Sequence, residues 1–196
     1  MRPVFFIAIN LNLLLQIKQI IFYFDDYNLF ICIQNYTIMN KFQLLLLFIG
    51  FNLFAQKQVP NLNLANLEGK SISLQSDFAE KDKLYIFSFW ATWCTPCISE
   101  LDELNDLQEE WKKAINFEIV AVSTDDSRTQ KRVKPLINGK GWEFNVLLDT
   151  NQDFKRAMSI VNIPYTIVVK NGLIVHIQNG YVPGNEKELF EKLKTL

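Results

Sequence analysis

The run Leu84-Tyr85-Ile86-Phe87-Ser88-Phe89-Trp90, followed after three residues by Cys94-Thr95-Pro96-Cys97, decides the fold of this protein. The first seven residues are almost continuously apolar and rich in aromatic side chains, which is typical of a strand buried on both faces of a sheet. After Cys97, apolar residues return every three or four positions, and this spacing predicts an amphipathic helix. The two cysteines therefore stand where a central strand passes into a helix.

A Cys-x-x-Cys pair at such a junction points to redox chemistry. The first cysteine lies at the free N–H groups of the helix N-terminus, which favour a negative charge, so we expect the Cys94 thiol to be exposed and acidified. Only a thiolate attacks a disulfide, which makes Cys94 the predicted nucleophile and Cys97 the resolving cysteine. Pro96 suits the first helical turn, where its missing N–H is not required.

Other uses of two cysteines fit the sequence less well. A zinc site needs further ligands, and beyond the pair the mature chain offers only His176, far along the sequence. A purely structural disulfide between residues three apart would close too small a loop to restrain the unfolded chain much. Coincidental buried cysteines would not explain the flanking Trp93 and Pro96. We therefore predict a redox-active disulfide between Cys94 and Cys97, with no metal and no other cofactor.

The remainder of the chain alternates strands and helices. Residues 59–67 and 71–74 predict a small hairpin, apolar runs at 117–122 and 142–148 predict strands, and residues 129–137 and 152–158 predict helices, with Pro135 disturbing the end of the first. Strands at 165–170 and 173–178 flank Asn171-Gly172, a strong hairpin signal, and residues 186–196 predict a closing helix. This order predicts an α/β fold with one mixed central sheet flanked by helices.

The first 55 residues differ in composition from the rest. Residues 39–55 have a positively charged start, a short apolar core and a small residue, Ala55, before Gln56, which indicates a secretory signal peptide; an uncleaved anchor is the alternative. Residues 1–38 are interpreted as an upstream extension from a mis-assigned start codon, the alternative being a membrane segment. Cys32 would then be absent, and one domain over residues 56–196 would lie in the periplasm or cell envelope.

Length and charge narrow the possible partners. The chain has 196 residues, enough for one core of good size, and its net charge is −1. Lysines and arginines form no cluster along the sequence, so nucleic acid is not an expected partner.

With the run from Phe89 to Cys97 and the dipeptide Ile163-Pro164 in view, residues 59–196 resemble the thioredoxin superfamily, specifically its TlpA/ResA-like extracytoplasmic branch. The N-terminal hairpin and a βα insertion over residues 117–158 are similar to that branch. The resemblance implies that the Ile163–Pro164 bond is cis and packs beside the dithiol, where Ile163 and Pro164 would contact substrate. Trp93, an aromatic residue just before the nucleophile, would line the same docking face, with plain packing as the alternative.

The resemblance also singles out Glu100, three residues after Cys97. One helical turn would place its carboxyl group beside Cys97, where it could accept or return a proton; the alternative is a solvated acid on the helix surface. Ser88 stands where thioredoxin itself carries a buried acid under the cysteine pair, so that proton route is not assumed. Asp102 stands where many relatives carry a helix-kinking proline.

These features predict an extracytoplasmic thiol-disulfide oxidoreductase. By resemblance its clients would be protein disulfides of the cell envelope, such as those of apocytochromes c, and a membrane electron carrier would re-reduce it. We expect a monomer. The alternatives are a peroxiredoxin-like peroxidase, although no Thr-x-x-Cys precedes a lone cysteine here, and a redox-inert binding module on the same fold.

Overall fold

Seven strands form one mixed sheet in the order β2-β1-β5-β4-β3-β6-β7. The computed structural model describes residues 57–196; the predicted extension 1–38, the predicted signal peptide 39–55 and Cys32 lie outside the described residues. The strands are β1 (Asn63–Asn66), β2 (Ser71–Ser73), β3 (Leu84–Trp90), β4 (Phe117–Ser123), β5 (Asn145–Leu148), β6 (Tyr165–Lys170) and β7 (Leu173–Asn179). Strand β3 is central, parallel to β4 and antiparallel to β6, as the predicted mixed sheet requires.

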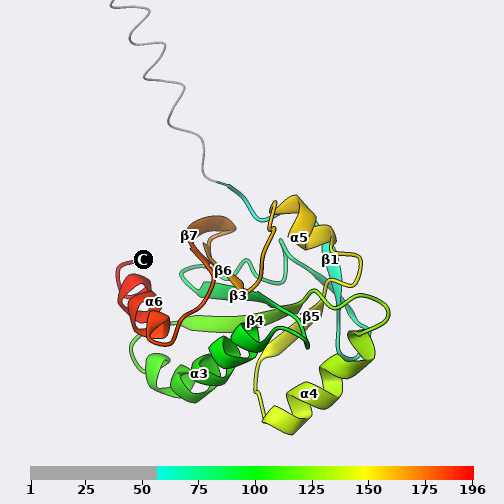
Figure 1. Cartoon of the computed structure of the whole chain (residues 1–196). Helices are drawn as coiled ribbons and strands as arrows, with labels where there is room; N and C mark the ends of the chain where they lie inside the picture. The colour runs from blue at the N-terminus through cyan, green and yellow to red at the C-terminus, as the bar shows by residue number, and fades with distance from the viewer. Residues whose placement is uncertain (1–56) are drawn as a thin grey trace, which may run out of the picture. The chain divides into compact units, whose positions relative to one another are not determined.

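Helices cover both faces of this sheet (Figure 1). They are α3 (Thr95–Trp111), α4 (Val133–Lys140), α5 (Asp153–Ala157) and α6 (Asn185–Leu193), with a short 3-10 turn η1 (Gln130–Arg132) before α4. Alternate residues of β3 enter two different clusters, because successive side chains of a strand point to opposite faces. Ile86 and Trp90 pack with residues of α3, α4 and α6, whereas Phe87 and Phe89 pack with α5 and the N-terminal hairpin. Within residues 57–196 no helix is long and apolar enough to cross a membrane.

Four elements differ in their bounds from the prediction by three residues or more. The first strand, β1, begins at Asn63 rather than Val59, and the closing helix, α6, ends at Leu193 rather than Leu196. The helix expected over 129–137 is η1 followed by α4, which runs on to Lys140, and Pro135 lies in the first turn of α4 rather than disturbing its end. A missing N–H has no cost in a first turn. Of the strand expected over 142–148, only Asn145–Leu148 forms a strand, β5. Trp142 lies before it and packs against Trp90, with their ring centroids 5.4 Å apart.

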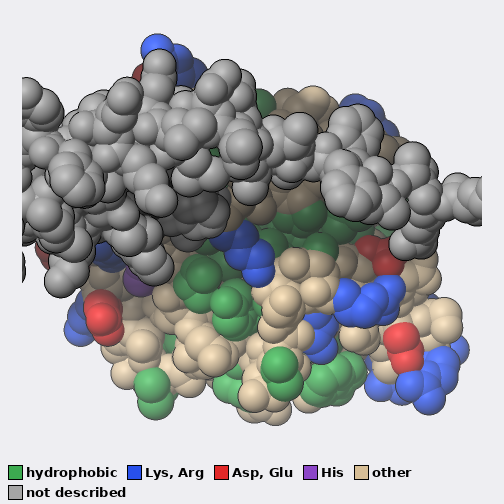
Figure 2. Space-filling model, turned by 90° about the horizontal axis from the view of Figure 1, so that it is seen from above, with side chains coloured by type: hydrophobic (Ala, Val, Ile, Leu, Met, Phe, Trp, Pro, Cys, Tyr) green, Lys and Arg blue, Asp and Glu red, His purple; other side chains and the backbone are tan. Residues whose placement is uncertain are grey.

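The surface of the described residues carries mixed charge on the face that is visible in Figure 2. Lysine and arginine side chains lie there at several separate places, with hydrophobic and uncharged groups between them. Among the described residues α3 is the longest helix, and it differs from this pattern because it contains no basic residue and six acidic ones. Glu100 is buried, and the other five are Asp102, Glu103, Asp106, Glu109 and Glu110.

Candidate active site

The cysteine pair lies at the junction between β3 and α3, as the sequence predicts. Cys94 is the N-cap residue of α3, with extended backbone angles (φ −96°, ψ 94°), and its carbonyl accepts the Ile98 N–H at 3.1 Å. The Cys94 N–H in turn donates to the Ala91 carbonyl at 3.0 Å and closes a turn between strand and helix. Pro96 favours the start of a helix at this position, because it fits the first helical turn.

Cys94 and Cys97 are joined by a disulfide, with an S–S distance of 2.04 Å. In this oxidised form Cys94 is 6 % exposed and Cys97 0 % exposed. Cys94 is thus less exposed than expected, because it packs with Cys97, Trp90 and Ala91 in the hydrophobic cluster on the α3 side of the sheet. Cys94 is still the more accessible residue of the two.

Glu100 is buried, and the alternative of a solvated surface acid is therefore wrong. The side chain is 2 % exposed, and each of its carboxyl oxygens accepts one hydrogen bond from a hydroxyl group. Ser88 Oγ donates to Oε2 at 2.9 Å and Thr166 Oγ1 donates to Oε1 at 2.9 Å. Ser88 and Thr166 are directly opposite each other on β3 and β6, so the pair of strands presents two donors to one carboxyl group of α3.

Burial controls the charge of this carboxyl group. Removal from water raises the pKa of Glu100 to about 7, against the opposing effect of the hydrogen bonds from Thr166 and Ser88, which favour the carboxylate. A group with such a pKa can hold or release a proton near neutral pH, which is the property required of an acid or base catalyst. Ser88 donates a hydrogen bond to Glu100. In thioredoxin the position of Ser88 carries a buried acid.

The loop before β6 borders the site. The Ile163–Pro164 peptide bond is cis, as the resemblance implies, and Ile163 packs against the cluster that contains both cysteines. The Pro164 carbonyl accepts the Gly180 N–H at 2.9 Å, which brings the segment after β7 next to the cis-proline loop. Trp93, directly before the nucleophile, is 62 % exposed and does not serve as core packing.

Sequence reasoning missed several residues of this region. Thr166 lies in an apolar strand, and no local signal marks it as a partner of Glu100. Tyr181, next to Gly180, donates to Glu186 Oε2 at 3.2 Å; burial, followed by the negative charge of Glu186, raises the pKa of Tyr181 to about 12, so its hydroxyl keeps its proton. Asp125 follows β4 and reaches the turn before Cys94, where it accepts the Thr92 N–H at 2.8 Å.

Metal ligands are not gathered at this site. Among the residues that the structure describes, no three His, Cys, Asp or Glu side chains form a group that could hold a metal ion. The chemistry available to the described residues at this site is that of two sulfur atoms, a buried carboxyl group and the hydroxyl groups beside it.

Comparisons with known proteins agree with this geometry. Residues 55–177 match the model of the AhpC/TSA family. The chain is 32 % identical over 120 residues to thiol-disulfide oxidoreductase ResA of Bacillus anthracis, covering 61 % of this chain and 66 % of that protein. It is 30 % identical over 141 residues to the protein of the same name from Bacillus thuringiensis subsp. konkukian, covering 71 % of this chain and 77 % of that protein.

A solved structure shows the same fold. A thioredoxin-like protein from Porphyromonas gingivalis aligns with a TM-score of 0.63 and 40 % identity, over 70 % of this chain and 90 % of that one. The predicted thioredoxin-like fold is confirmed by this similarity, by the order of strands and by the placement of the cysteine pair. The chain therefore belongs to the AhpC/TSA family of thioredoxin-like proteins and, within it, to the thiol-disulfide oxidoreductases of the ResA type.

Proposed function

We propose that this protein reduces disulfide bonds of client proteins in the cell envelope through the Cys94–Cys97 pair. One observation carries the proposal: the disulfide lies at the N-terminus of α3 with Cys94 on its accessible side and the buried Glu100 one turn beyond Cys97. The helix terminus favours the thiolate of the first cysteine, and the carboxyl group offers a proton acceptor for the second.

The proposed reaction proceeds in two exchange steps. In the reduced enzyme, the Cys94 thiolate attacks a client disulfide, forms a mixed disulfide and releases one client sulfur, which takes up a proton. Cys97 gives its proton to Glu100, and its thiolate attacks the Cys94 sulfur. The second client sulfur then leaves and takes up the proton held by Glu100, and the Cys94–Cys97 disulfide remains. The client has gained two electrons from the dithiol and two protons, one from Cys97 by way of Glu100 and one from solvent, into which the ionisation of Cys94 had released a proton.

Exposed apolar side chains near the site support a protein client. Trp93 is 62 % exposed, Val161 of the cis-proline loop 82 % and Val182, two residues after Gly180, 65 %. Exposed large apolar groups beside a reactive centre are typical of a surface that binds another protein. In this proposal Ile163 and Pro164 contact the client next to the mixed disulfide.

The proposed cellular setting follows from the sequence and the family. A predicted signal peptide over residues 39–55 would deliver the domain outside the cytoplasm, where an oxidising compartment keeps the pair as a disulfide unless electrons arrive. A membrane electron carrier would supply them. We further propose that the clients include proteins of cytochrome c assembly. The enzyme would act as a monomer.

Trapping of clients tests the roles of the two cysteines. Cys97→Ser should accumulate mixed disulfides with envelope proteins, whereas Cys94→Ser, which lacks the nucleophile, should not. Non-reducing gels of the tagged variants, followed by mass spectrometry of the trapped bands, measure this. Equal trapping by both variants would contradict the assignment.

Two activity assays separate the proposal from its alternatives. The wild-type protein with dithiothreitol should accelerate insulin reduction, and the double variant Cys94→Ser, Cys97→Ser should not. Consumption of hydrogen peroxide at a comparable rate would favour a peroxidase, and inactivity in both assays would favour a binding module.

A further inference from the structure

Asp125 is a buried carboxylate outside the set of residues that the reaction scheme uses. It lies two residues after the end of β4 and is 1 % exposed. Its Oδ2 accepts the Thr92 N–H at 2.8 Å and the Ser123 hydroxyl at 3.0 Å, and its Oδ1 accepts the Thr92 hydroxyl at 2.7 Å. A buried carboxylate is tolerated when donors of this kind surround it.

Thr92, which donates two hydrogen bonds to Asp125, belongs to the turn that precedes Cys94. Thr92 lies between Ala91 and Cys94, whose backbone groups are joined by the hydrogen bond from Cys94 N to Ala91 O. Asp125 therefore holds the middle of the turn that ends at the N-cap of α3. The two residues are 33 positions apart, so this contact joins the ends of two neighbouring parallel strands.

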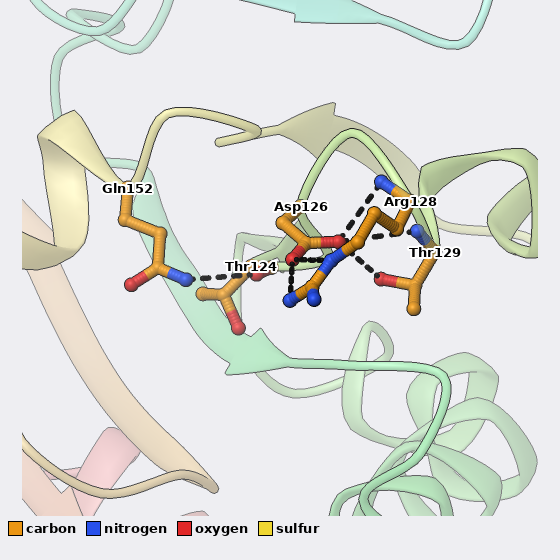
Figure 3. A network of polar contacts seen from close by, with 5 residues as sticks. All are labelled: Thr124, Asp126, Arg128, Thr129 and Gln152. Carbon is orange, nitrogen blue, oxygen red and sulfur yellow. Dashed lines mark hydrogen bonds and ion pairs between the residues drawn. The ribbon is translucent and has the colours of Figure 1, made fainter.

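The residues on both sides of Asp125 are themselves anchored. Thr124 donates to the Trp90 carbonyl through its N–H at 2.8 Å and its hydroxyl at 3.0 Å, and its own carbonyl accepts Gln152 Nε2 at 3.5 Å. On the other side, the Asp126 carboxylate accepts the backbone N–H groups of Arg128 and Thr129 and pairs with the Arg128 guanidinium (Figure 3). Hydrogen bonds thus restrain three successive residues, Thr124, Asp125 and Asp126. The backbone that carries Asp125 is therefore held in place where its side chain contacts Thr92.

We propose that Asp125 is a positioning residue for thiol-disulfide exchange, which holds the Ala91–Cys94 turn through Thr92 and thereby keeps Cys94 at the N-terminus of α3 when the disulfide is open. In the oxidised protein the bond to Cys97 already restrains Cys94. Reduction removes that restraint, and the contact between Asp125 and Thr92 remains to hold the turn. Small displacements of a reacting group lower reaction rates strongly, so the contact matters most in the reduced enzyme. The inference rests on the proposed role of Cys94 as nucleophile.

Three variants of the full-length reduced protein isolate this contact. Asp125→Ala removes all its hydrogen bonds to Thr92. Asp125→Asn removes the charge but can keep the bonds, with its amide oxygen accepting the Thr92 N–H and its amide group donating to the Thr92 hydroxyl. Asp149→Ala is the matched control, since Asp149 is also 1 % exposed and its carboxylate accepts the N–H groups of Phe154 and Lys155 at the start of α5.

The measurement is the rate of iodoacetamide alkylation of Cys94 as a function of pH, together with the equilibrium of the pair with glutathione. Asp125→Ala should slow alkylation at pH 7 by about tenfold or more and move the midpoint of its pH profile upward, because Cys94 loses its place at the helix terminus. Asp125→Asn and Asp149→Ala should keep the wild-type midpoint. Circular dichroism and urea unfolding report whether each variant is folded.

Two outcomes in folded protein decide against the proposal. A wild-type profile in folded Asp125→Ala would show that the contact does not position Cys94, and an equal shift in Asp125→Asn would assign the effect to charge instead. Should Asp125→Ala not fold, Thr92→Val, which loses only the hydroxyl bond, should give a smaller shift in the same direction, and no shift would overturn the inference. If wild-type Cys94, identified by comparison with Cys94→Ser, is no more reactive than an ordinary thiol, the proposed function itself fails.

Discussion

Glu100 carries its carboxyl group inside the protein, between hydroxyl donors on two neighbouring strands. If this group exchanges a proton with Cys97, Glu100→Gln should slow the reduction of insulin by up to about 10²-fold and flatten the pH dependence of the rate around pH 7. The amide has the size of the acid and can keep both contacts, with its oxygen accepting from one hydroxyl group and its NH2 group donating to the other, so the domain should remain folded. An unchanged pH-rate profile would leave Glu100 with a structural role alone.

The same group makes stability depend on pH. Since burial raises the pKa of Glu100 from 4.5 to about 7, the folded protein binds this proton more tightly than the unfolded chain does. Its contribution is fully present below pH 4.5 and is lost as the pH rises through 7, by about 3 kcal/mol in total. Urea unfolding at pH 4.5, 6 and 8 should show this loss in the wild type and a smaller one in Glu100→Gln. Thr166→Val, which removes a donor that favours the carboxylate, should raise the pKa of Glu100 further, so the variant should go on losing stability to a higher pH than the wild type does.

At the scale of elements, the N-terminus of α3 sets the chemistry of Cys94. Thr95 and Pro96 add no cationic group beside the nucleophile, so the helix end acts without a charged neighbour close in sequence. We expect a reduction potential nearer the value of about −270 mV typical of thioredoxin than the value of about −120 mV of DsbA. Equilibration with glutathione or dithiothreitol buffers measures it, and Thr95→His should make the pair more oxidising. A value at the oxidising end would make the protein a disulfide donor.

A second contact between elements joins α3 to the segment after α4. Asp102 accepts the indole N–H of Trp142 at 2.9 Å and pairs with Lys140 at 2.7 Å. Trp142 is only 6 % exposed, so loss of its acceptor leaves a buried donor unpaired. Asp102→Ala should lower the free energy of unfolding by about 1–3 kcal/mol, and Asp106→Ala, an exposed acid of the same helix, by no more than about 0.5 kcal/mol. Urea titrations provide both values; an Asp102→Ala cost that persists undiminished in a Trp142→Phe background would contradict this explanation.

At the scale of the whole molecule, the two hydrophobic clusters of the described residues are built from Val59 onward. One lies between the sheet and α3, α4 and α6, and the other between the sheet and α5 with the N-terminal hairpin. A chain beginning at Gln56 should therefore show the same urea midpoint and the same insulin reductase activity as the full chain. N-terminal sequencing of the protein from its natural host should find the same start, near Gln56; a protein that retains residues 1–38 would contradict the predicted processing.

The local patterns of the sequence by themselves determined the elements and the reactive pair. The apolar run of β3, the spacing of apolar residues in α3 and the Asn171-Gly172 turn each depend on neighbours in the chain, and the structure confirms all of them. The position of Cys94 and Cys97 at the strand-to-helix junction followed from the same signals. The family resemblance added the cis bond before Pro164.

Only the tertiary structure decided what surrounds these groups. Glu100 and Thr166 are 66 residues apart, Asp102 and Trp142 are 40, and Asp125 and Thr92 are 33. Each contact depends on strand order and register, such as the pairing that sets Ser88 opposite Thr166. No local pattern encodes such a pairing, because a hydrogen bond between distant residues exists only once the sheet has brought them together. The same acidic side chain on a helix can thus be a solvated surface group or a buried acid with a pKa of about 7, and the strands behind α3 make Glu100 the second.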